Sequence, residues 1–453
     1  MFAIPEAAEP LAGAIRGVFT SATYPRFVAL MGGMIVTMGR RTVSRALRVI
    51  QPLCRGHWSD YHRIYSQAKY SMWKLAAVLA RQVIALLPKD QVIVLLADDT
   101  VDGKDGDRVW ARGGHRDAVR SSRSRDNIKF GHKWLVLCVL VQLPGIARPW
   151  ALPVLCGLCC SPKVAEKANH RARTASQITR GLLLQMLRWF PDRMFVLIGD
   201  YGVVGHETAW LAHRRRTRVT VIGHLRGDAS LYHPPKDPNR PTRGGGHAKK
   251  GRRKLSPRRR ARQVKSSTET VAWYGGGKRT VRYVSDTGLW HNKHTTRVVP
   301  IRWVGVLEDK KANLEERYFF TTDESMPAAR IIELYALRWN IEVTFEEARG
   351  LLGLETTRHW CRQSVLRVTP LLFGLFSAVA LLGKELSKEV KVEYLSQTPC
   401  YHKRSMTFSD ALYLVRRELW ERTLLRHREK TRCLITLSPK LHKTLLTHLA
   451  AAA

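Results

Sequence analysis

Two short, almost unbroken apolar runs in this chain each end at an aspartate. The first, QVIVLLA (91–97), is followed by Asp98 and Asp99, and the second, MFVLIG (194–199), is followed by Asp200. Runs of this length and composition are typical of strands that a sheet buries on both faces. Ligands of open α/β sheets gather at the ends of the strands, so we expect an aspartate from each run to face the other.

The elements predicted around these two runs describe a mixed α/β sheet. Apolar, β-branched stretches indicate strands, and longer amphipathic stretches indicate helices. This alternation of strands and helices is typical of α/β folds in which helices cover a sheet. The predicted order is three strands, a helix, a strand, a helix and a strand, at 91–97, 133–143, 148–158, about 163–190, 194–199, 206–215 and 218–225.

The charge balance indicates a polyanionic partner. The chain has 76 lysines and arginines against 37 acidic residues, a formal net charge of +39. Such an excess destabilises a compact fold by self-repulsion unless a polyanion offsets it, which favours DNA or RNA over the weaker alternative of an anionic membrane. Between Arg240 and Lys265 there are twelve basic residues and no acid. We interpret this segment as a nucleic-acid contact rather than a merely solvated loop, with candidate residues Arg252, Arg253, Lys254, Arg258 and Arg259.

The regions that flank the sheet are predicted to be helical, apart from a β-rich segment. In the N-terminal region, Thr42 or Ser44 is placed to cap a short helix that carries Arg45 and Arg48, which fits a helix-turn-helix-like DNA-binding module or a plain helical subdomain. Period-two alternation over 271–322 predicts antiparallel strands joined by glycine-rich turns. The predicted division is a helical, DNA-binding region at 1–88, the first part of the core at 89–225, a basic loop and β-strand insertion at 226–322, a core helix at 323–360 and a helical C-terminal region at 361–453.

The sequence predicts a cytoplasmic protein. The N-terminus, MFAIPEAAEP, lacks the basic region of a secretory signal. The longest apolar run, PLLFGLFSAVALLG (370–383), is too short to span a bilayer and predicts a buried helix. Eight cysteines, three of them in CGLCC (156–160), fit a reducing compartment, and without a second pair they indicate core or strand-end positions rather than a zinc site.

One stretch, IIELYALRWNIEVTFEEARGLLGLETTRHW (331–360), places charged residues on a helix that is apolar nearly all round. At 100° per residue, one face within about a 60° arc carries a tyrosine, two arginines and a glutamate: Tyr335, Arg338, Glu342 and Arg349. Glu346 lies on the same face, so helical geometry does not separate it from Glu342, whereas Glu347 points about 120° away. Buried charges need partners, which here means a divalent metal or an Arg–Glu pair.

Three carboxylates around a hard cation suit phosphoryl transfer on DNA. Mg²⁺ prefers oxygen ligands, and Mn²⁺ is its expected substitute. Two such ions activate a nucleophile and stabilise the leaving oxygen of an in-line displacement. Seventeen histidines make the presence of His132 near the acids unremarkable, and Asp102, within DGKDGD (102–107), is interpreted as part of a turn.

The chain resembles bacterial insertion-sequence transposases of the DDE class, in the subgroup with a Tyr-x2-Arg-x3-Glu-x6-Lys signature. Tyr335, Arg338 and Glu342 match this signature, while Arg349 stands where the family has lysine. Asp98 opens an Asp-x-Thr motif like that of the family's first acid, although Asp99 stays an alternative, and Asp200 resembles the second acid. The resemblance covers about residues 85–360.

The resemblance implies an RNase H-like core with a β-rich insertion, and cut-and-paste transposition by a homodimer that pairs two DNA ends. Asp98, Asp200 and Glu342 would be the catalytic and metal-binding residues. Tyr335, Arg338 and Arg349 would contact DNA phosphate. A tryptophan of the insertion, Trp273 or Trp290, would stack on a flipped base, unless it packs the core of the insertion.

Other functions fit part of the pattern. A metal-dependent nuclease would use the same core without strand transfer, and a non-catalytic DNA-binding derivative would keep the charge alone. An RNA-packaging or ribosome-associated protein would explain the charge but not the placement of the three acids.

Overall fold

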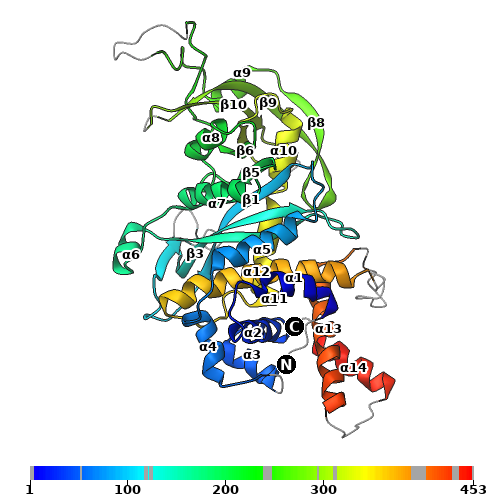
Figure 1. Ribbon diagram of the computed structural model, residues 1–453. Coiled ribbons are helices and arrows are strands. Elements are labelled where there is room, and N and C mark those ends of the chain that lie inside the picture. Colours follow the sequence, from blue (N-terminus) through cyan, green and yellow to red (C-terminus); the bar gives the residue numbers. More distant parts are fainter. Residues whose placement is uncertain are drawn as a thin grey trace.

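The protein folds around one long, twisted sheet with helices on both faces (Figure 1). The computed structural model describes residues 5–51, 54–116, 121, 126–237, 247–292, 295–309, 314–388, 403, 405–430 and 438–450. Part of the basic run, residues 238–246, and part of the predicted C-terminal helical region, including residues 389–402, lie outside this set.

The core of the sheet has five strands in the order β4-β3-β1-β5-β6. The pairs β1–β3 and β3–β4 are antiparallel, whereas β1–β5 and β5–β6 are parallel. This topology confirms the predicted RNase H-like mixed sheet. The bounds are β1 Ile93–Gly103, β3 Ile128–Val141, β4 Trp150–Cys159, β5 Phe195–Gly199 and β6 Val219–Leu225, and a short strand β2, Gly113–Arg116, joins the edge of β3.

Strand β1 is longer than its apolar run, which corrects the prediction that it stops at the aspartates. It continues through Asp98, Asp99 and Asp102 to Gly103 because β3 pairs with it along this whole length. Successive side chains of a strand point to opposite faces, so Asp98 and Asp99 lie on different sides of the sheet. Asp102 therefore belongs to the strand and not to a turn.

The insertion extends the core sheet instead of forming a separate one. Strand β11 pairs with β6, and β10, β9 and then β7 or β8 follow in antiparallel order. The predicted strands and glycine-rich turns are confirmed, while the described part of the basic segment also contains a short helix, α9. The bounds are β7 Leu231–Tyr232, α9 Pro257–Gln263, β8 Ser267–Ala272, β9 Lys278–His291, β10 Val298–Val306 and β11 Arg317–Thr321.

Helices cover both faces of the core. Helix α7 (Ala175–Trp189) packs on β3 and β4 beside α8 (His206–His213), and α11 and α12 (Arg362–Leu386) pack on the opposite face. The predicted helix at 163–190 is interrupted at 168–174, so α6 (Pro162–Lys167) is separate. Residues at the N-terminus form η1 Glu6–Ala8, α1 Glu9–Arg16, α2 Thr23–Val36, α3 Val43–Val49, α4 Trp58–Ser66 and α5 Met72–Ile84, and α13 (Phe408–Lys430) and α14 (Pro439–Ala450) follow α12.

The structure confirms a predicted helix cap, a buried apolar helix and cysteines at a strand end. The Thr42 side chain accepts a hydrogen bond from the Arg45 amide and caps α3, as one of the two alternatives predicted. Within the described residues, α12 is the helix long and apolar enough to cross a membrane, but it contacts α5, α13 and β4 and two thirds of its apolar window is buried, as in a core helix. Cys159 and Cys160 are buried free thiols at the end of β4, as expected.

The stretch predicted as one long helix is two helices with a turn between them. Helix α10 ends at Ala336 and α11 begins at Trp339 (α10 Ala328–Ala336, α11 Trp339–Leu352). Around the turn the backbone makes tight i to i−3 bonds, such as Arg338 N to Tyr335 O at 3.0 Å. The buried Asn340 side chain donates to the Leu337 carbonyl at 2.8 Å and so competes with the regular helical ladder.

Helix α11 also carries a partly buried acid whose charge opposes folding. Burial raises the pKa of Glu347 to about 7, although Arg148, 3.5 Å away, lowers it in part. Between pH 4.5 and 7 the folded protein holds a proton that the unfolded chain has released, so stability falls as pH rises through this window.

We predict that Glu347→Gln stabilises the protein above pH 7, by about 1–3 kcal/mol, because glutamine cannot ionise. The gain should vanish near pH 4.5. Thermal unfolding at pH 5 and pH 8 measures this difference, with Glu166→Gln on the surface of α6 as the control. A variant less stable than the parent at pH 8 would contradict the assigned cost of ionisation.

Candidate active site

Asp98 and Asp200 lie on neighbouring strands. In the parallel pair β1–β5, Ala97 is opposite Gly199, and each aspartate is the next residue along its chain. Adjacent strands are about 4.8 Å apart, so the two carboxylates occupy neighbouring positions at this edge. The apolar runs before them form this geometry, because both strands are buried on both faces.

Arg338, in the turn between α10 and α11, lies among the three acids. Its Nη1 is 2.5 Å from Asp98 Oδ2, and its Nη2 is 2.6 Å from Glu342 Oε1. The negative charge of Asp200 also raises the pKa of Arg338. The Tyr335 hydroxyl lies 3.5 Å from Asp200 Oδ1. Three distant parts of the chain thus bring Asp98, Asp200 and Glu342 around one cation.

Burial and charge oppose each other in this cluster. Burial raises the pKa of Asp98 to about 6, although the neighbouring Arg338 guanidinium lowers it. Burial by itself would lower the pKa of Arg338, but Asp98, Glu342 and Asp200 together hold it above its ordinary value. The side chains of Asp98 and Arg338 are only 17% and 14% exposed. A carboxylate as buried as that of Asp98 requires a positive charge beside it.

The structure separates residues that the sequence left as alternatives. Asp99 points to the other face of the sheet, where it pairs with Lys133 at 2.9 Å. On α11, Glu346 is exposed, whereas Glu342 pairs with Arg338. Asp98 and Glu342 are therefore the members of each pair that contact Arg338.

The remaining signature residues are held by contacts within the protein. Tyr335 packs on Phe319, with ring centroids 4.2 Å apart. Arg349 donates to Glu355 at 2.9 Å and to the Thr100 hydroxyl. Thr100 follows Asp98 on the same face of β1, so Arg349 joins the end of α11 to the strand that carries Asp98.

A hollow beside α9 and β7 is lined by four of the five candidate basic residues, Arg252, Arg253, Lys254 and Arg259. Arg252, Arg253 and Arg259 are exposed there. Lys254 is instead bound to Asp286 at 3.0 Å and is largely covered, while the exposed Arg258 lies 3.4 Å from Glu316. The hollow thus presents exposed guanidinium groups, and Lys254 helps to fix its wall.

Trp290 belongs to the core and not to the surface. Its ring is 8% exposed and packs against Phe320 and His206, with centroids 4.9 and 5.0 Å apart. A stacked base would find no free ring face there, and these contacts are those of the core-packing alternative. Trp273 is half-buried, with Arg279 over its ring at 5.2 Å.

An aromatic pocket next to the acids was not predicted. Tyr274 and Trp339 are each 46% exposed, and their rings stack with centroids 5.5 Å apart. They line this pocket together with Trp273, Tyr335 and Arg338. Trp339 immediately follows Arg338 in the sequence, but no spacing rule brings it to Tyr274, which lies at the β8–β9 turn.

The donor set of the cluster fits a hard divalent cation. Carboxylate oxygens are the ligands that Mg²⁺ prefers. Asp98 and Glu342 offer them beside Arg338, and Asp200 follows the neighbouring strand. The Arg338 guanidinium stands there as the positive charge that the acids require. The residues present therefore suit a divalent metal, with Asp98, Asp200 and Glu342 as candidate ligands.

A mixed sheet of RNase H-like topology with acids at adjacent strands defines a class of nucleic-acid-processing enzymes. A family model described as DDE superfamily endonuclease matches residues 16–280, more than half of the chain. The chain therefore belongs to the DDE superfamily of endonucleases. The matched region includes Asp98 and Asp200 and ends before Glu342.

Comparison with other known proteins adds little to this assignment. No curated protein matches the chain. Among solved structures, the chain is similar to a cryo-EM structure of the piggyBac transposase synaptic complex with hairpin DNA, at 10% identity and a TM-score of 0.42. The similarity covers 99% of this chain and 81% of that one.

We predict that Arg338→Gln lowers the free energy of unfolding by about 3–5 kcal/mol at pH 8, because it leaves the largely buried Asp98 carboxylate without its cation. Millimolar Mg²⁺ should restore more of the variant's melting temperature than it adds to the parent's. Thermal unfolding in chelator and in Mg²⁺ measures both effects. Arg330→Gln, which removes an exposed pair with Glu333 on α10, is the control. A variant insensitive to Mg²⁺ would argue against a cation site among these acids.

Proposed function

We propose that this protein is the transposase of a bacterial insertion sequence, an enzyme that cuts the ends of its element and joins them to target DNA with Mg²⁺. The observation that carries the proposal is that Arg338 pairs with Asp98 and Glu342 while the nearby charge of Asp200 raises the pKa of Arg338. Membership of the DDE superfamily supports it. The Tyr-x2-Arg-x3-Glu-x6 spacing of Tyr335, Arg338, Glu342 and Arg349 favours the insertion-sequence subgroup.

In this proposal Asp98, Asp200 and Glu342 hold the divalent cations. When bound, such ions activate the attacking oxygen and stabilise the leaving oxygen of an in-line displacement at phosphorus. Tyr335 keeps Asp200 in place through its hydroxyl. The burial that raises the pKa of Asp98 also excludes water, which strengthens every charge interaction in the site.

Arg338 has two roles in this account. In the free enzyme it neutralises Asp98 and Glu342. Once cations take its place, its guanidinium is free to turn to the DNA phosphate beside the cluster, which it can bind through two parallel hydrogen bonds. Binding of cation and of DNA would then support each other. The cation neutralises the acids that repel the DNA phosphate, and the phosphate takes up the Arg338 guanidinium that competes with the cation.

The reaction has two balanced steps. A water oxygen attacks phosphorus at the element end, and the bond from phosphorus to the 3′ oxygen breaks, leaving a 3′-hydroxyl and a 5′-phosphate. The 3′-hydroxyl then attacks a second phosphodiester, either on the opposite strand, which gives a hairpin, or in target DNA. The bond from that phosphorus to the 3′ oxygen of the attacked strand breaks, and this oxygen leaves as a new 3′-hydroxyl. Each attack displaces one oxygen, so no energy-carrying cofactor is needed.

The basic surface is proposed to hold the DNA. Exposed Arg252, Arg253 and Arg259 give phosphate contacts, and the net charge of +39 supplies the long-range attraction. Two such chains would pair the two ends of the element as a homodimer. The aromatic pocket of Tyr274 and Trp339 lies beside Arg338, where an unpaired base of bound DNA could stack.

We predict that Asp98→Asn, Asp200→Asn and Glu342→Gln each reduce cleavage at least 1,000-fold, because each removes a charged cation ligand. The assay uses the full chain, Mg²⁺ and duplex DNA carrying the inverted repeats that flank the gene, with products resolved on denaturing gels. DNA binding should stay within about threefold. Glu346→Gln, one turn away on α11, is the matched control and should cut normally.

Three outcomes would change this assignment. Normal cleavage by Asp200→Asn would contradict the catalytic role of the cluster. Cleavage by the parent without joined products would indicate a nuclease that performs no strand transfer. Binding without cleavage in any divalent metal would indicate a non-catalytic derivative.

We predict that Trp339→Ala weakens binding of DNA with a single-stranded end about 5- to 100-fold, the range expected for one lost stacking contact. Fluorescence anisotropy with labelled fully paired and overhanging duplexes measures it. Trp73→Ala, an exposed tryptophan on α5, is the control. Equal losses on both DNA forms would argue against stacking.

A further inference from the structure

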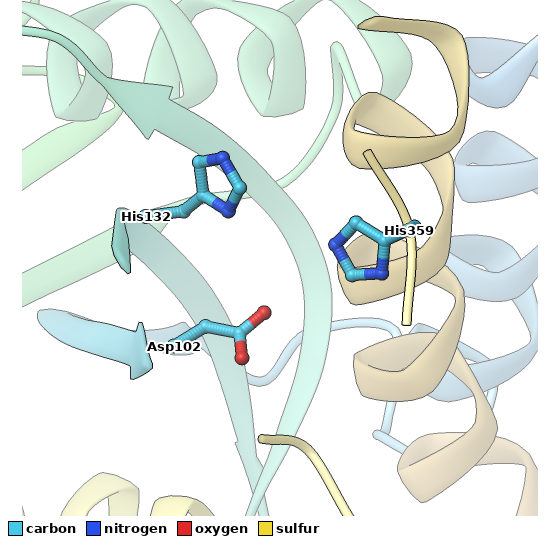
Figure 2. Close-up of side chains that lie close together, drawn as sticks. All are labelled: Asp102, His132 and His359. Atoms are coloured by element: carbon cyan, nitrogen blue, oxygen red, sulfur yellow. The ribbon is translucent and has the colours of Figure 1, made fainter. Parts of the chain in front are cut away.

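A second group of ionisable side chains lies on the same strand as Asp98, away from the acid cluster. Asp102 on β1 and His132 on β3 are directly opposite in the antiparallel register. His359 comes from the connector between α11 and α12. One possible ligand atom from each residue lies within 4.8 Å of the others, and Figure 2 shows the three side chains around one space.

The imidazoles of this group are buried without partners. His359 is 6% exposed, and neither of its ring nitrogens has a hydrogen-bond partner within the described chain. His132 is 1% exposed, and its Nδ1 also lacks a partner. Buried polar atoms are nearly always paired, because an unpaired one loses its hydrogen bonds to water without replacement. Because the three side chains of this group surround one space, these unpaired nitrogens indicate a missing ligand.

The hydrogen bond of His132 has the arrangement found at metal ligands. Its Nε2 is 2.8 Å from the Trp110 carbonyl oxygen, so Nε2 carries the proton and donates. The Nδ1 lone pair is then free. Metal-binding histidines typically donate their second ring N–H to a carbonyl or carboxylate in this way.

The charge state of the group also suits a soft-to-borderline metal. Burial lowers the pKa of His132 to about 4 and that of His359 to about 2, with the Lys104 ammonium lowering both further. Both imidazoles are therefore neutral, the form that binds metal. Asp102 is oriented by the Thr369 hydroxyl at 2.7 Å and by Lys104 Nζ at 2.7 Å. Burial raises the pKa of Asp102, although the Lys104 ammonium and the Thr369 hydrogen bond lower it in part.

Lys104 is the competing cation in this space. It balances the charge of Asp102 and also binds the Thr357 carbonyl and hydroxyl at 3.2 and 3.3 Å. It makes no hydrogen bond to either histidine within the described residues, so it leaves the ring nitrogens unsatisfied. A bound metal would share Asp102 with Lys104 or displace it.

We propose that Asp102, His132 and His359 bind one Zn²⁺ ion that fastens the α11–α12 connector to the sheet. Two imidazole nitrogens and a carboxylate oxygen are a zinc donor set, with water completing the tetrahedron, whereas Mg²⁺ avoids nitrogen. Asp102 is four residues beyond Asp98 on the same face of β1, about 13 Å away, so the zinc site is distinct from the acid cluster. The proposal does not rest on the proposed function.

The position of the site indicates what the metal would do. The connector follows α11, which carries Glu342, and His359 lies seventeen residues after that glutamate. Zinc would tie this connector to the strand that carries Asp98. Asp102, His132 and His359 would therefore act as positioning residues for the geometry of the acid cluster and not as catalytic residues.

Zinc content of the full-length protein tests the proposal. Protein stripped with chelator, dialysed against Zn²⁺ and freed of excess should hold about one zinc per chain by mass spectrometry of the metal. Co²⁺ in its place should give the intense visible absorption of four-coordinate cobalt with imidazole ligands. Chelation should lower the melting temperature, and added Zn²⁺ should restore it.

Variants of single residues identify which side chains bind the metal. His359→Gln and His132→Gln should reduce bound zinc at least tenfold, while His62→Gln, an exposed histidine on α4, should not. The double variant Asp98→Asn, Glu342→Gln should keep its zinc, which separates this site from the acid cluster. Lys104→Met, which removes the competing ammonium, should bind Zn²⁺ at least tenfold more tightly.

The test remains decisive even if a variant does not fold. If His359→Gln fails to fold, zinc content and the cobalt spectrum of the parent, with Lys104→Met, still test the site. A parent that retains less than about a tenth of an equivalent of zinc, or a folded His359→Gln that retains a full one, would overturn the proposal. The first result would leave a buried water as the partner of these nitrogens.

Discussion

Like charges gathered inside a protein repel one another, and the guanidinium of Arg338 is what allows this fold to gather three carboxylates. It forms ion pairs with Asp98 and Glu342, and the charge of Asp200 raises its pKa. Without a cation at this place, one or more of the acids would take up a proton or turn to solvent. The pKa of Asp98, raised to about 6 even beside Arg338, indicates how strongly burial opposes its charge.

The scaffold places these groups by three different means. Parallel pairing of β1 and β5 puts Asp98 and Asp200 side by side. The turn between α10 and α11 brings Arg338 and Glu342 to the same point. In one continuous helix, the direction of the Arg338 side chain relative to Tyr335 would follow from the helical repeat. The turn at 337–338 changes that direction. The geometry of the acid cluster thus depends on sheet pairing and on an interrupted helix together.

Acidic side chains lie together on one strand of the core sheet, whereas exposed arginines lie on the surface. The acid cluster and the group of Asp102, His132 and His359 lie along one face of β1. Around them the chain is strongly basic, and exposed arginines line the hollow beside α9. This division suits a protein that holds a polyanion on its surface and cations inside, because each kind of charge then meets its opposite.

Much of the fold follows from local pattern in the sequence. The apolar runs before Asp98 and Asp200 determine two buried strands, and the period-two stretches determine the insertion. These features depend on residues close together in the chain, where periodicity reports directly on which side chains are buried.

Tertiary structure alone decided the rest. It placed Asp98 and not Asp99 at the site, and Glu342 and not Glu346, because strand pairing and helix breaks set the direction of a side chain. It buried Trp290 and exposed Trp339. It also brought His359 to Asp102 and His132, more than two hundred residues earlier in the chain. Contacts at such separation leave no mark in local spacing, because they depend on how the whole sheet and its helices pack.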